Sequence, residues 1–277
     1  MRKFTLAISP CPNDTFMFYG LIKNKINHDF NVEVTFLDIE ELNQAALEST
    51  YDVSKISFSL LAKISKAYHL LKSGSALGEG CGPLLISKEM SSISRDQDYH
   101  CLIPGKNTTA NFLLSTLYPN IKNKEEILFS DIEVKLTQGY ADLGLVIHET
   151  RFTYDDNGFK KITDLGEEWE SQTNLPIPLG GIVANRFLDK VLTQDISDAI
   201  QESIKYAYAN ETECLEYCKE YAQDMQSEVM RSHIELYVNR YSVDLGHKGR
   251  KTIIFMLEKM KENEMIEHIP TDMFFNS

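Results

Sequence analysis

The sequence predicts an α/β protein that folds into two lobes. Short apolar runs, which are typical of buried strands, alternate with helical segments, and this order occurs in two separate stretches of the chain. Two apolar segments flanked by glycine, 82–86 and 176–184, are predicted to cross between the lobes. We therefore expect a larger discontinuous lobe formed by residues 1–88 plus 183–277, and a smaller inserted lobe formed by residues 89–182.

The larger lobe is predicted to begin with strands and helices joined by short turns. Pro10 and Pro12 force an extended turn after the first strand, and Asn13 with Asp14 is typical of a helix start. This strand–helix order predicts a parallel sheet. The expected elements are a strand at 4–9, a helix at 13–21, a strand at 32–38, a helix at 40–48, a strand at 51–56, and a helix capped by Ser57 or Ser59.

The smaller lobe follows the same order, and one of its strands ends at a histidine. An apolar run over 143–147 leads directly into His148. Runs of this kind are typical of buried strands in parallel sheets. The expected elements are a strand ending at 103, a helix at 108–118, a strand at 127–129, a helix before the strand that leads to His148, a strand at 162–164 and a helix at 165–170. From residue 189 onward the chain is predicted to be helical.

Two α/β units, two crossings and a helical C-terminal part together describe the two-lobed fold of periplasmic binding proteins, type II. In that fold the ligand lies in a cleft between lobes that are joined by two hinge strands, and closure of the cleft excludes water. The fold includes both transport receptors and enzymes, so it does not by itself name a function.

Composition and charge limit the classes of partner. The net charge of −13 over 277 residues argues against nucleic acid, whose phosphates need a basic face. No segment approaches the roughly 18 apolar residues of a membrane span, and the N-terminal stretch does not resemble a signal peptide. The five cysteines lack the spacing of a disulfide framework. We therefore expect a cytoplasmic protein that binds a small molecule and does not insert into a membrane.

His148 is the first candidate for a catalytic residue. Parallel α/β sheets bind ligands beyond the carboxyl ends of their strands, and His148 is predicted to lie at such an end. The ordinary pKa of an imidazole, about 6.5, lets it accept a proton near neutral pH. A structural histidine that hydrogen-bonds a loop is the alternative.

Three further loops are predicted to face the same cleft. They are strand-to-helix turns that offer hydroxyls, an ammonium group and backbone N–H donors, which an anionic ligand of this acidic protein would need. Each also has a simpler explanation: the Pro10–Pro12 turn could be rigid and nothing more, Ser57 and Thr108 could be helix caps only, and Lys55 could be a solvated surface charge. The candidate binding residues are Ser9, Asn13, Lys55, Ile56, Ser57, Thr108, Thr109 and Ala110.

Several other chemistries lack their sequence motifs. There is no HExxH pattern and no carboxylate-rich calcium loop, so we expect no metal site. Neither GxGxxG nor a Walker motif is present, which disfavours a nucleotide cofactor, and GxSxG is also missing. Cys81 and Cys101 are candidate nucleophiles, but nothing in the sequence pairs either thiol with a base.

Seven sequence blocks resemble the 1,4-dihydroxy-6-naphthoate synthase family of the futalosine route to menaquinone. They run in order along the chain, and Ile56 and Lys106 are variants within them. Several spaced blocks are more specific than any single motif. The blocks are SPCPNDTF (9–16), DVSKISF (52–58), PGKNTTA (104–110), GLVIHETRFTY (144–154), DLGEEWE (164–170), LPIPLGG (175–181) and DLGHKGR (244–250).

The resemblance implies a cofactor-independent lyase that converts cyclic dehypoxanthinyl futalosine into 1,4-dihydroxy-6-naphthoate and dihydroxyacetone. It implies that His148 is the proton acceptor and that 55–57 and 109–110 hold the carboxylate-bearing substrate. A cytoplasmic solute-binding protein of the same fold and a chorismate dehydratase are the alternatives. The sequence leaves open whether the chain forms a homodimer.

Overall fold

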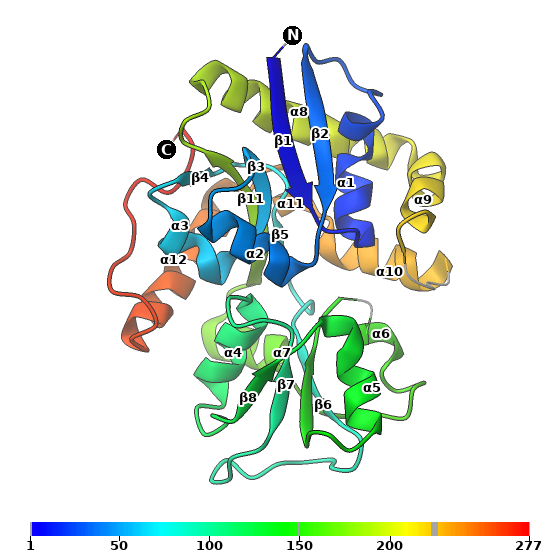
Figure 1. Cartoon of the computed structure of the whole chain (residues 1–277), viewed down its shortest axis with the longest axis vertical. Coiled ribbons are helices and arrows are strands. Elements are labelled where there is room, and N and C mark those ends of the chain that lie inside the picture. Colours follow the sequence, from blue (N-terminus) through cyan, green and yellow to red (C-terminus); the bar gives the residue numbers. More distant parts are fainter. Residues whose placement is uncertain (1, 149, 223–226, 277) are drawn as a thin grey trace. The chain divides into compact units, whose positions relative to one another are not determined.

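The computed structural model describes residues 2–148, 150–222 and 227–276. The chain forms two compact units, each with its own sheet (Figure 1). The first unit consists of Met1–Gly78 and Pro178–Ser277, and the second of Glu79–Ile177.

The sheet of the first unit has a parallel core, as its strand–helix order predicts. Its strand order is β2-β1-β3-β11-β4, and β5 pairs with β11. Strand β1 is parallel to both β2 and β3, whereas β11 runs antiparallel to β3 and β4. The strands are β1 (Arg2–Ile8), β2 (Phe30–Phe36), β3 (Val53–Ser57), β4 (Tyr68–Leu70), β5 (Ala76–Gly78) and β11 (Ile177–Asn185).

Two glycines of β11 lie in tightly packed surroundings. A Cβ on Gly180 would lie 2.6 Å from the carbonyl oxygen of Ile56, and one on Gly181 would lie 2.8 Å from the ring of Phe58. Real Cβ atoms do not approach neighbours this closely. A side chain at Gly180 would therefore push β11 away from β3, and one at Gly181 would displace the Phe58 ring.

Helices cover the first sheet and supply most of its core. Helix α1 packs on α8, α9 and α10, and apolar side chains of α1, α8 and α9 meet those of β1 in one cluster. The helices are α1 (Pro12–Ile22), α2 (Ile39–Leu47), α3 (Leu61–Ile64), α8 (Lys190–Ala209), α9 (Glu211–Lys219), α10 (Ser227–Tyr237), α11 (Arg240–Val243) and α12 (Gly246–Glu262), with a 3-10 turn at Phe58–Leu60.

The second unit has a mixed sheet with the strand order β10-β6-β9-β7-β8. Strand β7 is parallel to β8 and β9, and β6 is antiparallel to β9 and β10. The strands are β6 (Leu84–Ser87), β7 (Cys101–Ile103), β8 (Lys124–Glu126), β9 (Leu143–Val146) and β10 (Lys160–Asp164); the helices are α4 (Thr109–Leu117), α5 (Ile132–Thr137), α6 (Thr150–Thr153) and α7 (Leu165–Thr173), with a 3-10 turn at Phe129–Asp131.

Two differences from the sequence prediction concern the second unit. Its boundaries are Glu79 and Ile177, and β6, which the prediction places in the larger lobe, pairs with β9 and β10 and so belongs to the second unit. The strand predicted at 127–129 lies at Lys124–Glu126, where it pairs with β7, and a 3-10 turn starts at Phe129.

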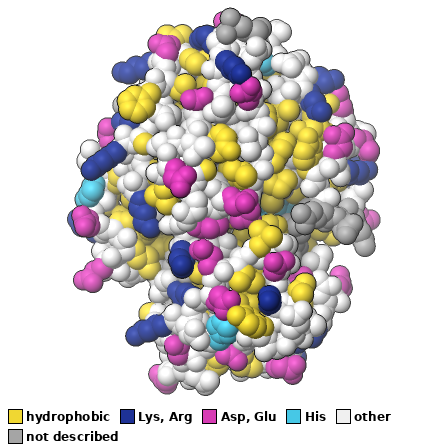
Figure 2. Space-filling view, in the orientation of Figure 1, with side chains coloured by type: hydrophobic (Ala, Val, Ile, Leu, Met, Phe, Trp, Pro, Cys, Tyr) yellow, Lys and Arg dark blue, Asp and Glu magenta, His cyan; other side chains and the backbone are white. Residues whose placement is uncertain are grey.

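Two properties of the whole chain bear on its partners. Within the described ranges, no helix combines the length and the apolar character that crossing a membrane requires. On the face drawn in Figure 2, Lys and Arg side chains are interspersed with Asp and Glu side chains.

Candidate functional site

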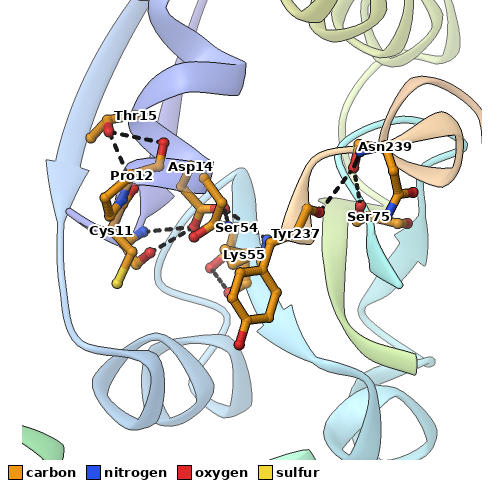
Figure 3. A network of polar contacts seen from close by, with 12 residues as sticks. Cys11, Pro12, Asp14, Thr15, Ser54, Lys55, Ser75, Tyr237 and Asn239 are labelled. Carbon is orange, nitrogen blue, oxygen red and sulfur yellow. Dashed lines mark hydrogen bonds and ion pairs between the residues drawn. The ribbon is translucent and has the colours of Figure 1, made fainter. Parts of the chain in front are cut away.

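Three of the predicted binding residues meet at one buried carboxylate, that of Asp14. Lys55 Nζ lies 2.8 Å from Asp14 Oδ1, and Asn13 Nδ2 donates to the same oxygen at 2.8 Å. The hydroxyl and the backbone N–H of Ser9 donate to Asp14 Oδ2 at 2.8 and 3.2 Å. The side chains of Asp14 and Lys55 are only 1% and 6% exposed. Figure 3 shows Lys55 and Asp14 within this network.

The local sequence explains why the carboxylate lies there. Strand β1 ends at Ile8, and Pro12 occupies the first turn of α1, where a missing N–H costs nothing. The Cys11 carbonyl accepts hydrogen bonds from the N–H groups of Asp14 and Thr15, both at 3.0 Å. Asp14 thus lies in the first helical turn, where the helix dipole favours a negative charge. Parallel pairing of β1 with β3 brings Lys55 within reach.

This geometry excludes the interpretation of Lys55 as a solvated surface charge. Its ammonium group is buried and paired, and it lies within β3 rather than in the turn after it. An ammonium has three N–H donors, and Asp14 takes one of them. The sequence pattern predicts Asn13 and Asp14 as helix-start residues, and Asn13 also as a binding residue, but it does not single out Asp14 as the centre of a polar cluster. The helix in fact begins at Pro12, and no side chain caps it.

Ser57 is held by a second residue that the sequence analysis missed, Asn43 of α2. Asn43 Nδ2 donates to Ser57 Oγ at 3.0 Å, and the Ser57 N–H donates to Asn43 Oδ1 at 2.9 Å. Ser57 precedes the 3-10 turn but makes no side-chain cap to it. Strand alternation puts Ile56 on the opposite face from Lys55 and Ser57, and its side chain is fully buried. Only the main chain of Ile56 is left for a ligand contact.

The predicted residues of the second unit follow two parallel neighbours, β7 and β9. Cys101 pairs with Leu143, so the carboxyl ends of both strands meet at one edge of the sheet. Thr108 caps α4: its Oγ1 accepts from the Asn111 N–H at 3.2 Å and donates to the Gly105 carbonyl at 2.7 Å. Thr108 is therefore a helix cap, and its role in substrate binding stays a prediction.

The two residues after Thr108 open helix α4. Thr109 and Ala110 are its first two residues, and both are buried. Backbone N–H groups in a first helical turn have no partner within the helix and point along its axis, which makes them suitable donors for an anion.

His148 lies two residues beyond the end of β9, and all of β9 is buried. The histidine is partly exposed, and its ring meets the ring of Phe129 edge to face with centroids 5.1 Å apart. Its backbone adopts φ +57°, in the left-handed region that residues other than glycine rarely occupy. Such a conformation costs of order 1 kcal/mol or more and persists only where its surroundings enforce it. Its sequence neighbour Glu149 lies outside the described residues.

The cysteines do not support a nucleophile. Burial raises the pKa of the Cys81 and Cys101 thiols to about 12, so both are protonated at neutral pH. Among the residues that the structure describes, no three His, Cys, Asp or Glu side chains are grouped so that they could hold a metal ion.

The chain is similar in sequence to known proteins of one family. A family model described as menaquinone biosynthesis matches residues 4–262. A relative from Thermus thermophilus named 1,4-dihydroxy-6-naphthoate synthase is 36% identical over 99% of this chain and 100% of its own length. A relative of the same name from Streptomyces coelicolor is 35% identical over 96% of each chain.

Solved structures agree with the fold. A protein from Archaeoglobus fulgidus superposes with a TM-score of 0.91 at 31% identity, over 95% of this chain and 98% of its own. The ligand-binding component of an ABC-type import system from Staphylococcus aureus superposes with a TM-score of 0.72 at 15% identity, over 100% and 97% of the two chains. The predicted two-lobed periplasmic-binding-protein-like fold is confirmed. The chain therefore belongs to the menaquinone biosynthesis family, together with the two 1,4-dihydroxy-6-naphthoate synthases that it resembles over almost its whole length.

Proposed function

We propose that this chain is a 1,4-dihydroxy-6-naphthoate synthase, which cleaves cyclic dehypoxanthinyl futalosine into 1,4-dihydroxy-6-naphthoate and dihydroxyacetone. The observation that carries this proposal is the similarity to two relatives of that name, at 35–36% identity and with at least 96% of each chain covered. The import component shares only 15% identity, so it supports the fold and not a transport function. No observation favours a chorismate dehydratase.

His148 is the proton acceptor in this proposal. Removal of a proton from a sugar hydroxyl starts ring opening and carbon–carbon cleavage, and the aromatic product supplies the driving force. Such a reaction needs one well-placed base and fixed donors for the oxyanion that develops. The position of His148 after a buried strand, in an unusual backbone conformation, supports this role. The proposed base-catalysed cleavage uses neither a metal ion nor a nucleotide cofactor.

Each unit has its own candidate binding residues, which we propose for the substrate. The first unit offers the Lys55–Asp14 cluster with Ser9 and Asn13, and also Ser57, which Asn43 holds in place. The second unit offers the start of α4 at Thr109 and Ala110. Asp14 already compensates the charge of Lys55, so we assign the substrate carboxylate to the N–H donors of α4 and the neutral hydroxyls of the substrate to the first unit.

Turnover without a cofactor tests the proposal. The purified chain, dialysed against EDTA, is incubated with the cyclic substrate, and formation of 1,4-dihydroxy-6-naphthoate is followed by absorbance and mass spectrometry. We expect turnover without added metal or nucleotide. A chain that binds the substrate but never converts it would instead be a solute-binding protein. A cytoplasmic location and a homodimer remain predictions, which cell fractionation and light scattering would test.

Variants of two histidines test the role of His148. We expect His148→Asn to abolish product formation in single-turnover experiments while substrate still binds. His100→Asn is the matched control, because His100 precedes β7 and so lies at the opposite edge of the same sheet from the end of β9. The control is expected to keep nearly full activity. Near-normal turnover by His148→Asn would exclude this histidine as the base.

A further inference from the structure

Arg151 links the turn that carries His148 to two fixed points of the second unit. It belongs to the short helix α6, which begins two residues after the histidine. Its Nη1 donates to the carbonyl of Gly82 at 2.7 Å, and its Nη2 donates to Asp164 Oδ2 at 2.5 Å. The side chains of Arg151 and Asp164 are 14% and 1% exposed, so the pair is shielded from solvent.

Asp164 is held in place independently of Arg151. Its other oxygen, Oδ1, accepts hydrogen bonds from the N–H groups of Gly166 and Glu167 at 2.8 and 3.1 Å and so caps helix α7. One carboxylate oxygen therefore accepts hydrogen bonds from the start of α7, and the other accepts one from the guanidinium of Arg151. Arg151 is bound to a group that cannot move without uncapping α7.

Gly82 is fixed as well, because it lies against the start of the same helix. A Cβ on Gly82 would come within 2.3 Å of the Gly166 Cα atom. Gly82 also lies just before β6, in the segment by which the chain enters the second sheet. Both acceptors of the Arg151 fork are thus anchored at the N-terminus of α7.

Two further contacts at the turn are the hydrogen bond from the Arg151 N–H to the His148 carbonyl, at 3.4 Å, and the ring contact of His148 with Phe129. Helix α6 is a single turn of four residues, and an isolated helical turn is unstable. The histidine itself lies outside regular structure with φ +57°. A strained conformation of this kind needs support from its surroundings.

We propose that Arg151 is the positioning residue for His148, and that its ion pair with Asp164 fixes the turn on which the base lies. This proposal rests on the function proposed above, in which His148 accepts the proton. The rate of proton transfer depends steeply on geometry, since a displacement of about 1 Å can cost about 100-fold in rate. Loss of the anchor should therefore lower kcat and leave substrate binding nearly unchanged.

Two conservative variants break the anchor and leave the rest of the structure in place. Arg151→Lys keeps the charge, but an ammonium cannot span both acceptors as the planar guanidinium does. Asp164→Asn keeps an oxygen to cap α7, since Asn caps helices as well as Asp, but it turns an NH₂ group toward Arg151. We expect each variant to lower kcat by about 10- to 100-fold with KM changed by less than about 3-fold. The double variant should be hardly slower than either single variant, because both changes remove one interaction.

Arg186 provides a matched control for the loss of an arginine fork. It donates to the Ser65 carbonyl at 2.8 Å and to the Asp272 carboxylate at 2.9 Å. It lies in the first unit, and among the described residues its side chain forms no hydrogen bond with a proposed site residue. Arg186→Lys should lower the melting temperature less than Arg151→Lys, because Asp272 is 73% exposed, and it should leave kcat unchanged.

The variants of His148, Arg151 and Arg186 together distinguish a failure of the positioning role from a failure of the proposed function. Full turnover by His148→Asn would overturn the role of the base and, with it, the positioning role. Loss of turnover in His148→Asn together with a wild-type kcat in Arg151→Lys would overturn the positioning role alone. The positioning role would also be overturned if Arg186→Lys lowered kcat as much as Arg151→Lys does, because the loss of activity would then reflect a general loss of stability.

Discussion

Replacing Asp14 with Asn should lower the free energy of unfolding by about 3–5 kcal/mol, because it leaves the buried ammonium of Lys55 without a counter-charge. The Asp14 carboxylate accepts four hydrogen bonds, two on each oxygen. The Asn amide offers one acceptor oxygen, so two of the four donors would face an NH₂ group. Hydrogen bonds to a charged group contribute about 1.5–3 kcal/mol each, and the loss of two gives a value in the same range.

A second substitution isolates the charge effect. Lys55→Met removes the ammonium that Asp14→Asn leaves unpaired and keeps most of the apolar stem. The double variant should therefore be more stable than Asp14→Asn alone, by at least about 1 kcal/mol, because truncating one partner of a buried pair costs more than replacing both.

Urea unfolding followed by circular dichroism measures all three variants. Asp38→Asn is the matched control, because Asp38 caps α2 through its side chain and Asn is an equally good cap. We expect this control to change the free energy of unfolding by less than about 0.5 kcal/mol. A loss below about 1 kcal/mol in Asp14→Asn, or strict additivity in the double variant, would refute the reasoning about an uncompensated buried charge.

Three further predictions concern the binding site, the thiols and acid stability. Thr109→Val should weaken substrate binding by about 1–2 kcal/mol, because a substrate group loses its partner; calorimetry in the His148→Asn background measures this, and equal affinity would contradict it. Burial raises the pKa of Cys81 to about 12, so iodoacetamide at pH 8 should label this thiol in urea but leave it unmodified in the native chain. Hydrogen bonds, first from Lys25 and then from Tyr19, lower the pKa of Glu213 from 4.5 to about 2. Its stabilising effect is therefore complete above pH 4.5 and is lost as the pH falls toward 2, so Glu213→Gln should lower the melting temperature at pH 7 but hardly at pH 2. If the melting temperatures of the wild-type chain and the Glu213→Gln variant differed by the same amount at both pH values, the result would contradict a stabilising role of the Glu213 charge.

Features with a local signature could be predicted from the sequence. The apolar run before His148 forms the buried strand β9, and the helix predicted around Trp169 is present as α7. The two glycine-flanked apolar segments form the strands β6 and β11. In each case the pattern lies within a few consecutive residues, which is the range over which hydrophobic periodicity carries information.

The residues that hold the site in place could not be predicted, because their partners are distant in sequence. Asp14 and Lys55 are 41 positions apart, and only the parallel register of β1 and β3 brings them together. Asn43 reaches Ser57 from a neighbouring helix in the same way. Strand β8 was misplaced for a related reason: Lys-Glu-Glu has no apolar signature, and pairing with β7 makes it a strand.

The most direct test of the central claim is a single-turnover experiment with cyclic dehypoxanthinyl futalosine, the EDTA-treated wild-type chain and the His148→Asn variant. Our account predicts that the wild-type chain releases 1,4-dihydroxy-6-naphthoate and dihydroxyacetone in equal amounts, while the variant binds the substrate and forms neither product. Wild-type protein that binds the substrate without cleaving it, or a His148→Asn variant that cleaves it at the wild-type rate, would contradict the account.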